Sequence, residues 1–182
     1  VNDISAGTFD GAMFSTVARL GVPLVMMHTR GTPETMPSLA RYAGGRVTET
    51  VCCELATRVG AAHTAGLAPW RLVADPGLGF AKTPEHSLQL LRELPTFISH
   101  LSSTGGGGCC GTLVGASRKG FVGKVLRQPD ALQRQWGNAA TVCAAVVAGA
   151  DIVRVHEVAE MHQVAAMSDA IHRGWSSDDA TA

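Results

Sequence analysis

The sequence lacks an excess of charge of either sign. Its 15 Lys and Arg residues balance 15 Asp and Glu residues, so the formal net charge is zero. A surface for nucleic acid or for an anionic membrane favours an excess of Lys and Arg. The sequence also lacks any apolar run of the roughly 18 residues that a membrane helix needs. We therefore expect neither a nucleic acid nor a membrane to be the main partner.

Several functional motifs are also missing. No C-x-x-C occurs, and the five cysteines are Cys52, Cys53, Cys109, Cys110 and Cys143. An odd number with two adjacent pairs suits neither a zinc site nor a disulfide framework, so we expect free thiols in a reducing compartment. No H-x-x-x-H or acidic cluster indicates a metal cage, and no G-x-S-x-G indicates covalent acyl chemistry. No signal or transit peptide is visible, and the chain opens at Val1 inside an apolar stretch. We interpret that start as a cut.

Strand-like apolar runs alternate with segments of helical periodicity. The runs predict strands at residues 1–5, 23–28, 71–75, 112–116 and 151–156. Helices are predicted at about residues 13–20, 47–59, 84–94, 130–149 and 158–171. Short, wholly apolar strands are typical of a parallel sheet buried on both faces. Five such units predict an α/β fold.

Two α/β architectures fit this pattern: an open doubly wound sheet and a (β/α)8 barrel. A barrel usually needs about 250 residues, so the chain would supply five of its eight units. We place the domain at residues 1–174, with a flexible Gly-rich insert near 103–110 and a disordered tail at 175–182.

Polar residues stand at the carboxyl end of every predicted strand. They are Asn2 and Asp3, His28 and Arg30, Asp75, Ser117 with Arg118 and Lys119, and Arg154 with His156. Parallel α/β folds carry the active site at that edge. Five independent strands with polar groups on one rim therefore predict one site there.

The residue types at this rim indicate two kinds of recognition. Asp75 can accept paired N–H donors from a heterocycle, and Asn2 offers a donor and an acceptor for a second ring edge. A helix cap and a turn are the structural alternatives for these two residues. The cations after the last two strands form a pocket of the kind that binds phosphate in barrels. A solvated basic loop, or a satisfied core pair of Arg154 and His156, is the alternative. His28 with Arg30 either extends the anion site or forms a structural hydrogen bond.

The same residues resemble the ordered motifs of dihydropteroate synthases across nearly the whole chain, up to about Ile171. The motifs are Val1–Ser5, Met27–Gly31, Asp75–Phe80, Ser117–Lys119 and Arg154–His156. Further stretches look most like the plant and algal members, namely Gly7–Asp10, Met13–Ala18 and Pro69–Arg71. The chain departs from the family at Ala81, where glycine is frequent, and at Thr29, where methionine is frequent.

This resemblance implies a (β/α)8 TIM barrel and a transferase of folate biosynthesis. The family condenses 6-hydroxymethyl-7,8-dihydropterin pyrophosphate with 4-aminobenzoate to give 7,8-dihydropteroate and pyrophosphate. By resemblance, Asn2, Asp75 and Lys119 bind the pterin, and Arg154 and His156 bind the pyrophosphate. Phe80, Ser117 and Lys119 form the aminobenzoate pocket, where sulfonamides compete. The resemblance makes Lys119, Arg154 and His156 the catalytic residues.

The family carries three further strands before this region, with a magnesium-binding Asn, a mobile loop and an acidic pterin ligand. The resemblance therefore implies a C-terminal portion whose Mg2+ ligand lies outside the chain. We expect this piece alone to be inactive and poorly folded, because five units leave two open sheet edges. The family also implies a homodimer when complete, and in plants a fused pterin pyrophosphokinase and mitochondrial targeting; otherwise the protein would be cytoplasmic.

Three other functions compete with this interpretation. A pterin-binding methyltransferase domain shares the barrel, but it has no pyrophosphate for Arg154 and His156 to hold. A Schiff-base aldolase would use Lys119 as its nucleophile. A non-catalytic or truncated product would lack activity altogether.

Overall fold

The computed structural model describes residues 1–103, 108–109 and 111–176. Its strands are β1 (Asn2–Asp3), β2 (Leu24–Met27), β3 (Leu72–Asp75), β4 (Gly111–Val114) and β5 (Ile152–Val153). Its helices are α1 (Met13–Leu20), α2 (Met36–Leu39), α3 (Val47–Thr64), α4 (Pro84–Arg92), α5 (Leu94–Ser103), α6 (Gly120–Leu126), α7 (Gln135–Val147) and α8 (Val158–Arg173). Short 3₁₀ turns lie at Ala43–Gly45, Pro69–Arg71 and Ala131–Gln133.

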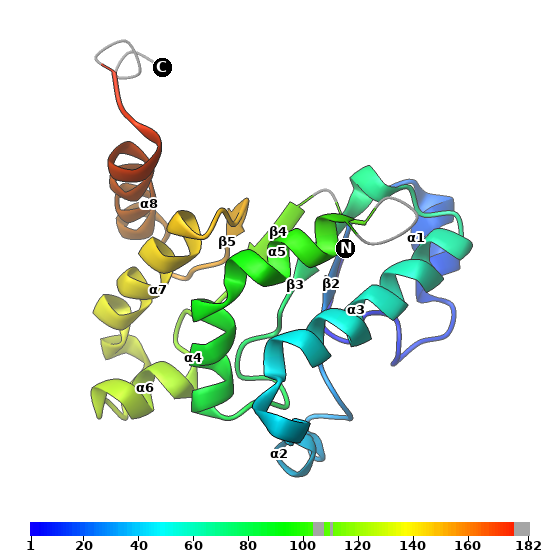
Figure 1. The fold of residues 1–182 in the computed structure, drawn as a ribbon, viewed down its shortest axis with the longest axis horizontal. Helices are drawn as coiled ribbons and strands as arrows, with labels where there is room; N and C mark the ends of the chain where they lie inside the picture. The colour runs from blue at the N-terminus through cyan, green and yellow to red at the C-terminus, as the bar shows by residue number, and fades with distance from the viewer. Residues whose placement is uncertain (104–107, 110, 177–182) are drawn as a thin grey trace.

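The five strands form one parallel sheet in the order β1-β2-β3-β4-β5. A doubly wound sheet has a point where the strand order reverses, and this sheet has none. Sequential order with a helix after each strand is the arrangement of a (β/α)8 barrel. Figure 1 shows the helices following one another in an arc along the strands. The sheet order therefore resolves the choice between the two predicted architectures in favour of a barrel segment.

One face of the sheet carries the core. Leu24 and Met26 of β2, with Leu72 and Ala74 of β3, are fully buried. They join a cluster with helix residues that include Val51, Leu55 and Val59 of α3, Leu90 of α4, and Leu94 and Phe97 of α5. Successive side chains of a strand alternate between faces, so Val25 and Val73 point to the opposite face, where they are only partly buried. That second face corresponds to the interior of a barrel.

The predicted elements are confirmed, and three helices are additional. Pro95 ends the predicted helix early, because a proline inside a helix removes a hydrogen bond and clashes with the preceding turn. The predicted helix ends at Arg92, and a second helix, α5, follows from Leu94 to Ser103, beyond the predicted range. α2 and α6 were not predicted, since each spans only a turn or two. None of the helices in the described residues is long and apolar enough to cross a membrane.

The sequence also makes predictions for the Gly-rich insert near 103–110, for the tail at 175–182 and for the cysteines. Most of the Gly-rich insert and nearly all of the tail at 175–182 lie outside the described residues. Among the described cysteines, Cys52, Cys53 and Cys143 are free thiols.

Candidate active site at the carboxyl rim of the sheet

Asp75, the last residue of β3, is 2% exposed. Its Oδ1 accepts a hydrogen bond from the backbone N–H of Gly77 at 2.8 Å. Burial raises the pKa of this carboxyl group, whereas the Gly77 hydrogen bond and the charges of Lys119, Arg154 and Lys82 oppose that rise. A buried carboxylate is stable only when it is paired or hydrogen-bonded. The Gly77 N–H supplies the hydrogen bond, and the charges of three cations from three loops favour the ionised form.

Lys119 follows β4 and reaches across to the loop after β3. Its Nζ donates to the carbonyl oxygen of Leu78 at 2.6 Å and lies 4.8 Å from the centroid of the Phe80 ring. Burial lowers the pKa of Lys119 to about 8, opposed by Asp75 and assisted by Arg154. The Lys119 ammonium thus contacts the Leu78 carbonyl group and the Phe80 ring, and the charge of Asp75 acts on its pKa.

Arg154 and His156 follow β5, which is shorter than predicted and ends at Val153. The sequence suggested a buried strand here, but both residues are exposed. The reason is that β5 lies at the edge of the sheet, with β4 as its neighbour on one side only among the described residues. A Cβ at Gly115 would lie 3.1 Å from a terminal guanidinium nitrogen of Arg154, so this guanidinium lies against Gly115.

Ser117 orients His156. The backbone N–H of His156 donates to Ser117 Oγ at 3.2 Å, and the Ser117 hydroxyl lies 2.7 Å from His156 Nδ1. The Ser117 hydroxyl also donates to Glu157 Oε2 at 3.4 Å, so Ser117 links the His156 ring to that carboxylate. Arg118 forms an ion pair with Glu157 at 2.8 Å, which corrects the expectation that both cations of this loop serve the anion pocket.

Asn2 lies on the same face of the sheet as Asp75, one layer of side chains nearer the amino ends of the strands. Asn2 pairs in register with Val25, Val25 pairs with Val73, and Asp75 follows Val73 by two residues. β2 lies between β1 and β3, and neighbouring strands are about 4.8 Å apart. Asn2 and Asp75 are therefore two strand spacings apart across the sheet. The structure brings Asp75, Lys119, Phe80 and Arg154 to one rim. It places Asn2 nearer the amino ends of the strands. Asp3 has a structural role, because its carboxylate accepts hydrogen bonds from Ser5 and Gly7.

A family model described as "Pterin binding enzyme" matches residues 1–156. The chain belongs to the pterin-binding enzyme family. Its relatives include a dihydropteroate synthase of Synechocystis, which is 42% identical over 95% of this chain. A pea protein named "Folate synthesis bifunctional protein, mitochondrial" is 38% identical over 97% of the chain. The chain spans 56% of the Synechocystis protein and 35% of the pea protein.

Solved structures of the pterin-binding enzyme family agree with the fold. The Thermus thermophilus dihydropteroate synthase in complex with 6HMPPP matches with a TM-score of 0.81 at 35% identity, covering 93% of this chain and 63% of that chain. The same enzyme in complex with 4-aminobenzoate matches with a TM-score of 0.82. The Yersinia pestis enzyme, solved with a sulfonamide drug complex, matches with a TM-score of 0.85 at 30% identity. The chain therefore forms five of the eight β/α units of a TIM barrel.

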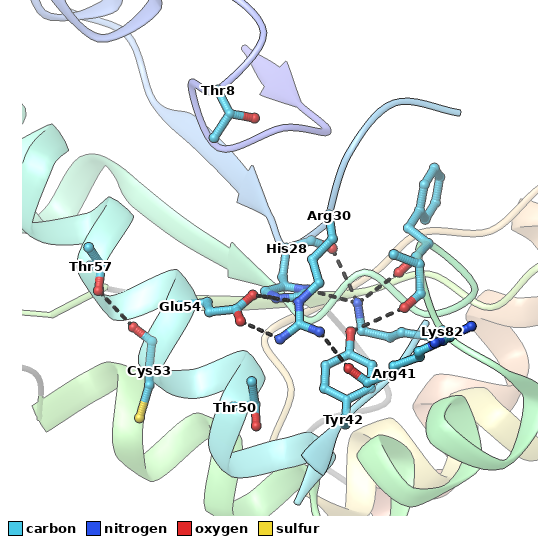
Figure 2. A network of polar contacts seen from close by, with 12 residues as sticks. Thr8, His28, Arg30, Arg41, Tyr42, Thr50, Cys53, Glu54, Thr57 and Lys82 are labelled. Carbon is cyan, nitrogen blue, oxygen red and sulfur yellow. Dashed lines mark hydrogen bonds and ion pairs between the residues drawn. The ribbon is translucent and has the colours of Figure 1, made fainter. Parts of the chain in front are cut away.

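Around His28 and Arg30, this member of the pterin-binding enzyme family has polar residues that the sequence did not single out, namely Glu54, Tyr42 and Lys82 (Figure 2). His28 is buried, and its Nε2 lies 2.9 Å from Glu54 of α3. The guanidinium of Arg30 also binds Glu54 and lies 4.3 Å from the Tyr42 ring centroid. Burial and the neighbouring Lys82 lower the pKa of His28 to about 4. The structural interpretation of His28 and Arg30 is therefore the correct one, and they are not free to extend an anion site.

Three residues other than glycine adopt left-handed backbone conformations at this rim. Ala6, Ala81 and Arg118 have φ angles of 47°, 47° and 61°, in the loops after β1, β3 and β4. Such a conformation costs an L-residue about 1–2 kcal/mol, and backbone strain of this kind concentrates at functional sites. Ala81, where the resemblance expects a frequent glycine, is thus a strained position.

No group of three or more His, Cys, Asp or Glu side chains that could hold a metal ion occurs in the part of the chain that the structure describes. The rim residues therefore do not by themselves fit a magnesium site.

Proposed function

We propose that the protein is a dihydropteroate synthase, which joins 6-hydroxymethyl-7,8-dihydropterin pyrophosphate to 4-aminobenzoate. The observation that carries this proposal is the buried Asp75 carboxylate facing Lys119 and Arg154 on one rim of a pterin-binding barrel. An anionic acceptor next to two cations suits a substrate that combines an N–H-rich ring with a diphosphate ester. The relatives named dihydropteroate synthase, and the structure with 4-aminobenzoate, support the same substrates.

In the proposed binding mode, Asp75 and Asn2 accept and donate hydrogen bonds to the pterin ring, with Lys119 at its edge. Arg154 has a planar guanidinium with no hydrogen-bonding partner recorded among the described residues. It can therefore bind pyrophosphate oxygens with two parallel N–H groups. The exposed ring of His156 adds a third donor in this binding mode when its Nε2 carries a proton.

The proposed reaction needs no enzyme nucleophile. The bond between the pterin methylene carbon and the pyrophosphate oxygen breaks, and the electron pair leaves with pyrophosphate. The amine nitrogen of 4-aminobenzoate forms the new C–N bond and then releases a proton. Arg154 and His156 stabilise the negative charge on the leaving group, and alignment of the amine supplies the remaining acceleration.

The 4-aminobenzoate pocket is proposed to lie beside Phe80 and Lys119, whose ring and ammonium are already stacked. Ser117 contributes to this pocket through His156, since its hydroxyl is hydrogen-bonded to that ring. Sulfonamides, which resemble 4-aminobenzoate in shape, would compete here. A methyltransferase is less consistent with the site, because a methyl donor would leave the guanidinium of Arg154 without an anionic partner.

The proposal extends to the context of the protein. We infer that Mg2+ assists the complete enzyme through a ligand outside this chain. A homodimer through the C-terminal helices is supported by the exposed Trp136, Met167 and Ile171. Fusion to a pterin pyrophosphokinase and a mitochondrial location are supported by the pea relative, and a cytoplasmic location applies if the protein is not of the plant type.

Dihydropteroate formation by the full-length protein that contains this chain tests the proposal. We expect Lys119→Ala and Arg154→Ala to lower kcat/KM by about a hundredfold or more, as removal of a charge-stabilising group does elsewhere. Lys124→Ala and Arg19→Ala, which change exposed cations, serve as matched controls and should retain activity. A folded full-length protein that forms no dihydropteroate, or that is indifferent to Lys119→Ala and Arg154→Ala, would overturn the assignment.

A further inference from the structure

Lys82 is a buried lysine whose role the proposed chemistry does not explain. It is 8% exposed, and its Nζ lies 2.9 Å from His28 Nδ1, 3.3 Å from the His28 carbonyl oxygen and 3.0 Å from the Phe80 carbonyl oxygen. A lysine ammonium has three N–H donors, and these three acceptors use all of them. Lys82 therefore connects the end of β2 to the loop between β3 and α4.

The contacts continue from His28 through Glu54. Because Nδ1 of His28 accepts from Lys82, its Nε2 carries the proton and donates to Glu54 at 2.9 Å. Arg30 binds the same carboxylate. Although burial raises the pKa of Glu54, the hydrogen bonds from His28 and Arg30 lower it to about 2. Burying a lysine is costly. The three acceptors satisfy its donors, while burial lowers the pKa of Lys82 to about 7.

The contacts of Arg30 lead back to the loop between β3 and α4, in which Lys82 lies. Arg30 stacks on the Tyr42 ring, and the Tyr42 hydroxyl donates to the carbonyl oxygen of Ala81 at 3.2 Å. Lys82 and Tyr42 thus donate hydrogen bonds to two adjacent carbonyl groups, those of Phe80 and Ala81. Ala81 has a left-handed backbone with φ 47°, a conformation that persists only when its surroundings fix it.

The loop held in this way forms one wall of the site. The carbonyl oxygen of Leu78 and the ring of Phe80 are the two groups that hold the Lys119 ammonium. A shift of this loop would move the Phe80 ring and Lys119 together. Lys82 also acts on Asp75 through its charge, which favours the ionised carboxylate.

We propose that Lys82 is a positioning residue that fixes Phe80, and through it Lys119, for binding 4-aminobenzoate. This inference rests on the proposed function. Lys82 touches neither substrate in this scheme. It sets the position of the aromatic wall, so its removal should affect the KM for 4-aminobenzoate more than the KM for the pterin substrate.

Steady-state kinetics of Lys82→Met in the full-length protein tests this inference. We expect the KM for 4-aminobenzoate to rise about tenfold or more, since small displacements in a site have large effects. The KM for the pterin substrate should rise by a smaller factor, because Asn2 and Asp75 stand on β1 and β3 and, of the pterin contacts, only Lys119 moves with this loop. Lys124→Met replaces an exposed lysine and is the matched control. Tyr42→Phe removes the hydrogen bond from the Tyr42 hydroxyl to the Ala81 carbonyl with minimal change in shape. It should raise the KM for 4-aminobenzoate by a smaller factor, and it tests the role of the loop if Lys82→Met folds poorly.

A second measurement separates the inference from the proposed function. Hydrogen exchange of the peptide covering residues 77–81 should be faster in Lys82→Met and in Tyr42→Phe than in the wild type, whether or not the protein makes dihydropteroate. Absence of product from the wild type would refute the proposed function alone. An active wild type whose folded variants keep the KM for 4-aminobenzoate, or raise both KM values equally, would refute the positioning role of Lys82.

Discussion

Gly115, the residue after β4, leaves the space that the Arg154 guanidinium occupies. A Cβ at this position would meet the guanidinium at 3.1–3.4 Å, and the flexible arginine can move away without unfolding the protein. We expect Gly115→Ala to raise the KM for the pterin substrate several-fold, because Arg154 would no longer be aligned with the pyrophosphate. Steady-state kinetics with a parallel thermal melt measures this effect.

Gly60→Ala is the matched control, since nothing lies within 4 Å of a Cβ added there. Its kinetic constants should match those of the wild type. If Gly115→Ala left the KM for the pterin substrate unchanged while Arg154→Ala raised it, the position of the guanidinium against Gly115 would have no role in binding.

At the residue scale, the sequence predicted groups that stand at strand ends and missed those that serve them. Asp75 and Lys119 were predicted because each directly follows an apolar strand. Lys82 was missed because a lysine two residues beyond Phe80 has no periodic signal, and lysine is seldom buried. Glu54 was missed because it lies within the amphipathic stretch of α3, where a charged residue normally faces solvent. Only tertiary contacts reveal that the two meet at His28.

At the element scale, the prediction was most accurate where packing and periodicity agree. Val47, Val51, Leu55 and Val59 recur every four residues, and all four are buried in α3. The strands are shorter than their apolar runs, since hydrogen-bonded pairing stops where the neighbouring strand ends. The strand-like pattern of residues 151–156 does not reveal that β5 lies at an edge, because a sequence pattern does not tell which neighbours a strand has.

The junction between β2 and the loop after β3 predicts a specific dependence of stability on pH. The pKa of His28 is about 4 in the folded protein, against an ordinary value of 6.5. As pH falls, the unfolded chain takes up this proton first, so the free energy of unfolding decreases between these values by up to about 3 kcal/mol. Glu54 adds to the loss only below its ordinary pKa of 4.5, and Lys82 contributes no slope below pH about 7.

Urea unfolding of the full-length protein between pH about 4.5 and 6.5 measures this slope. His28→Gln keeps an acceptor and a donor but cannot titrate, so its free energy of unfolding should vary less over the same interval. Equal slopes for the wild type and His28→Gln would show that His28 does not account for the loss.

At the scale of the whole molecule, the sheet has two edges. Among the described residues β1 and β5 each pair with one strand only, and the face that would line a barrel leaves Ile152 of β5 42% exposed. Unpaired parallel strands with apolar faces favour association with other chains. The share of the Synechocystis relative that this chain spans, 56%, fits a barrel that needs further strands to close.

We therefore expect the isolated 182-residue chain to self-associate and to form no dihydropteroate, even though its rim holds Asp75, Lys119 and Arg154. The physical reason is that a site built on a barrel rim depends on strands that fix its curvature, and five strands leave that curvature unconstrained. Size-exclusion chromatography with light scattering, beside the dihydropteroate assay, measures both properties. A longer protein that supplies the remaining strands is the matched control and should be both discrete in size and active. A monomeric, active 182-residue chain would show that the five units and their cations suffice for the reaction, and that barrel closure contributes only stability.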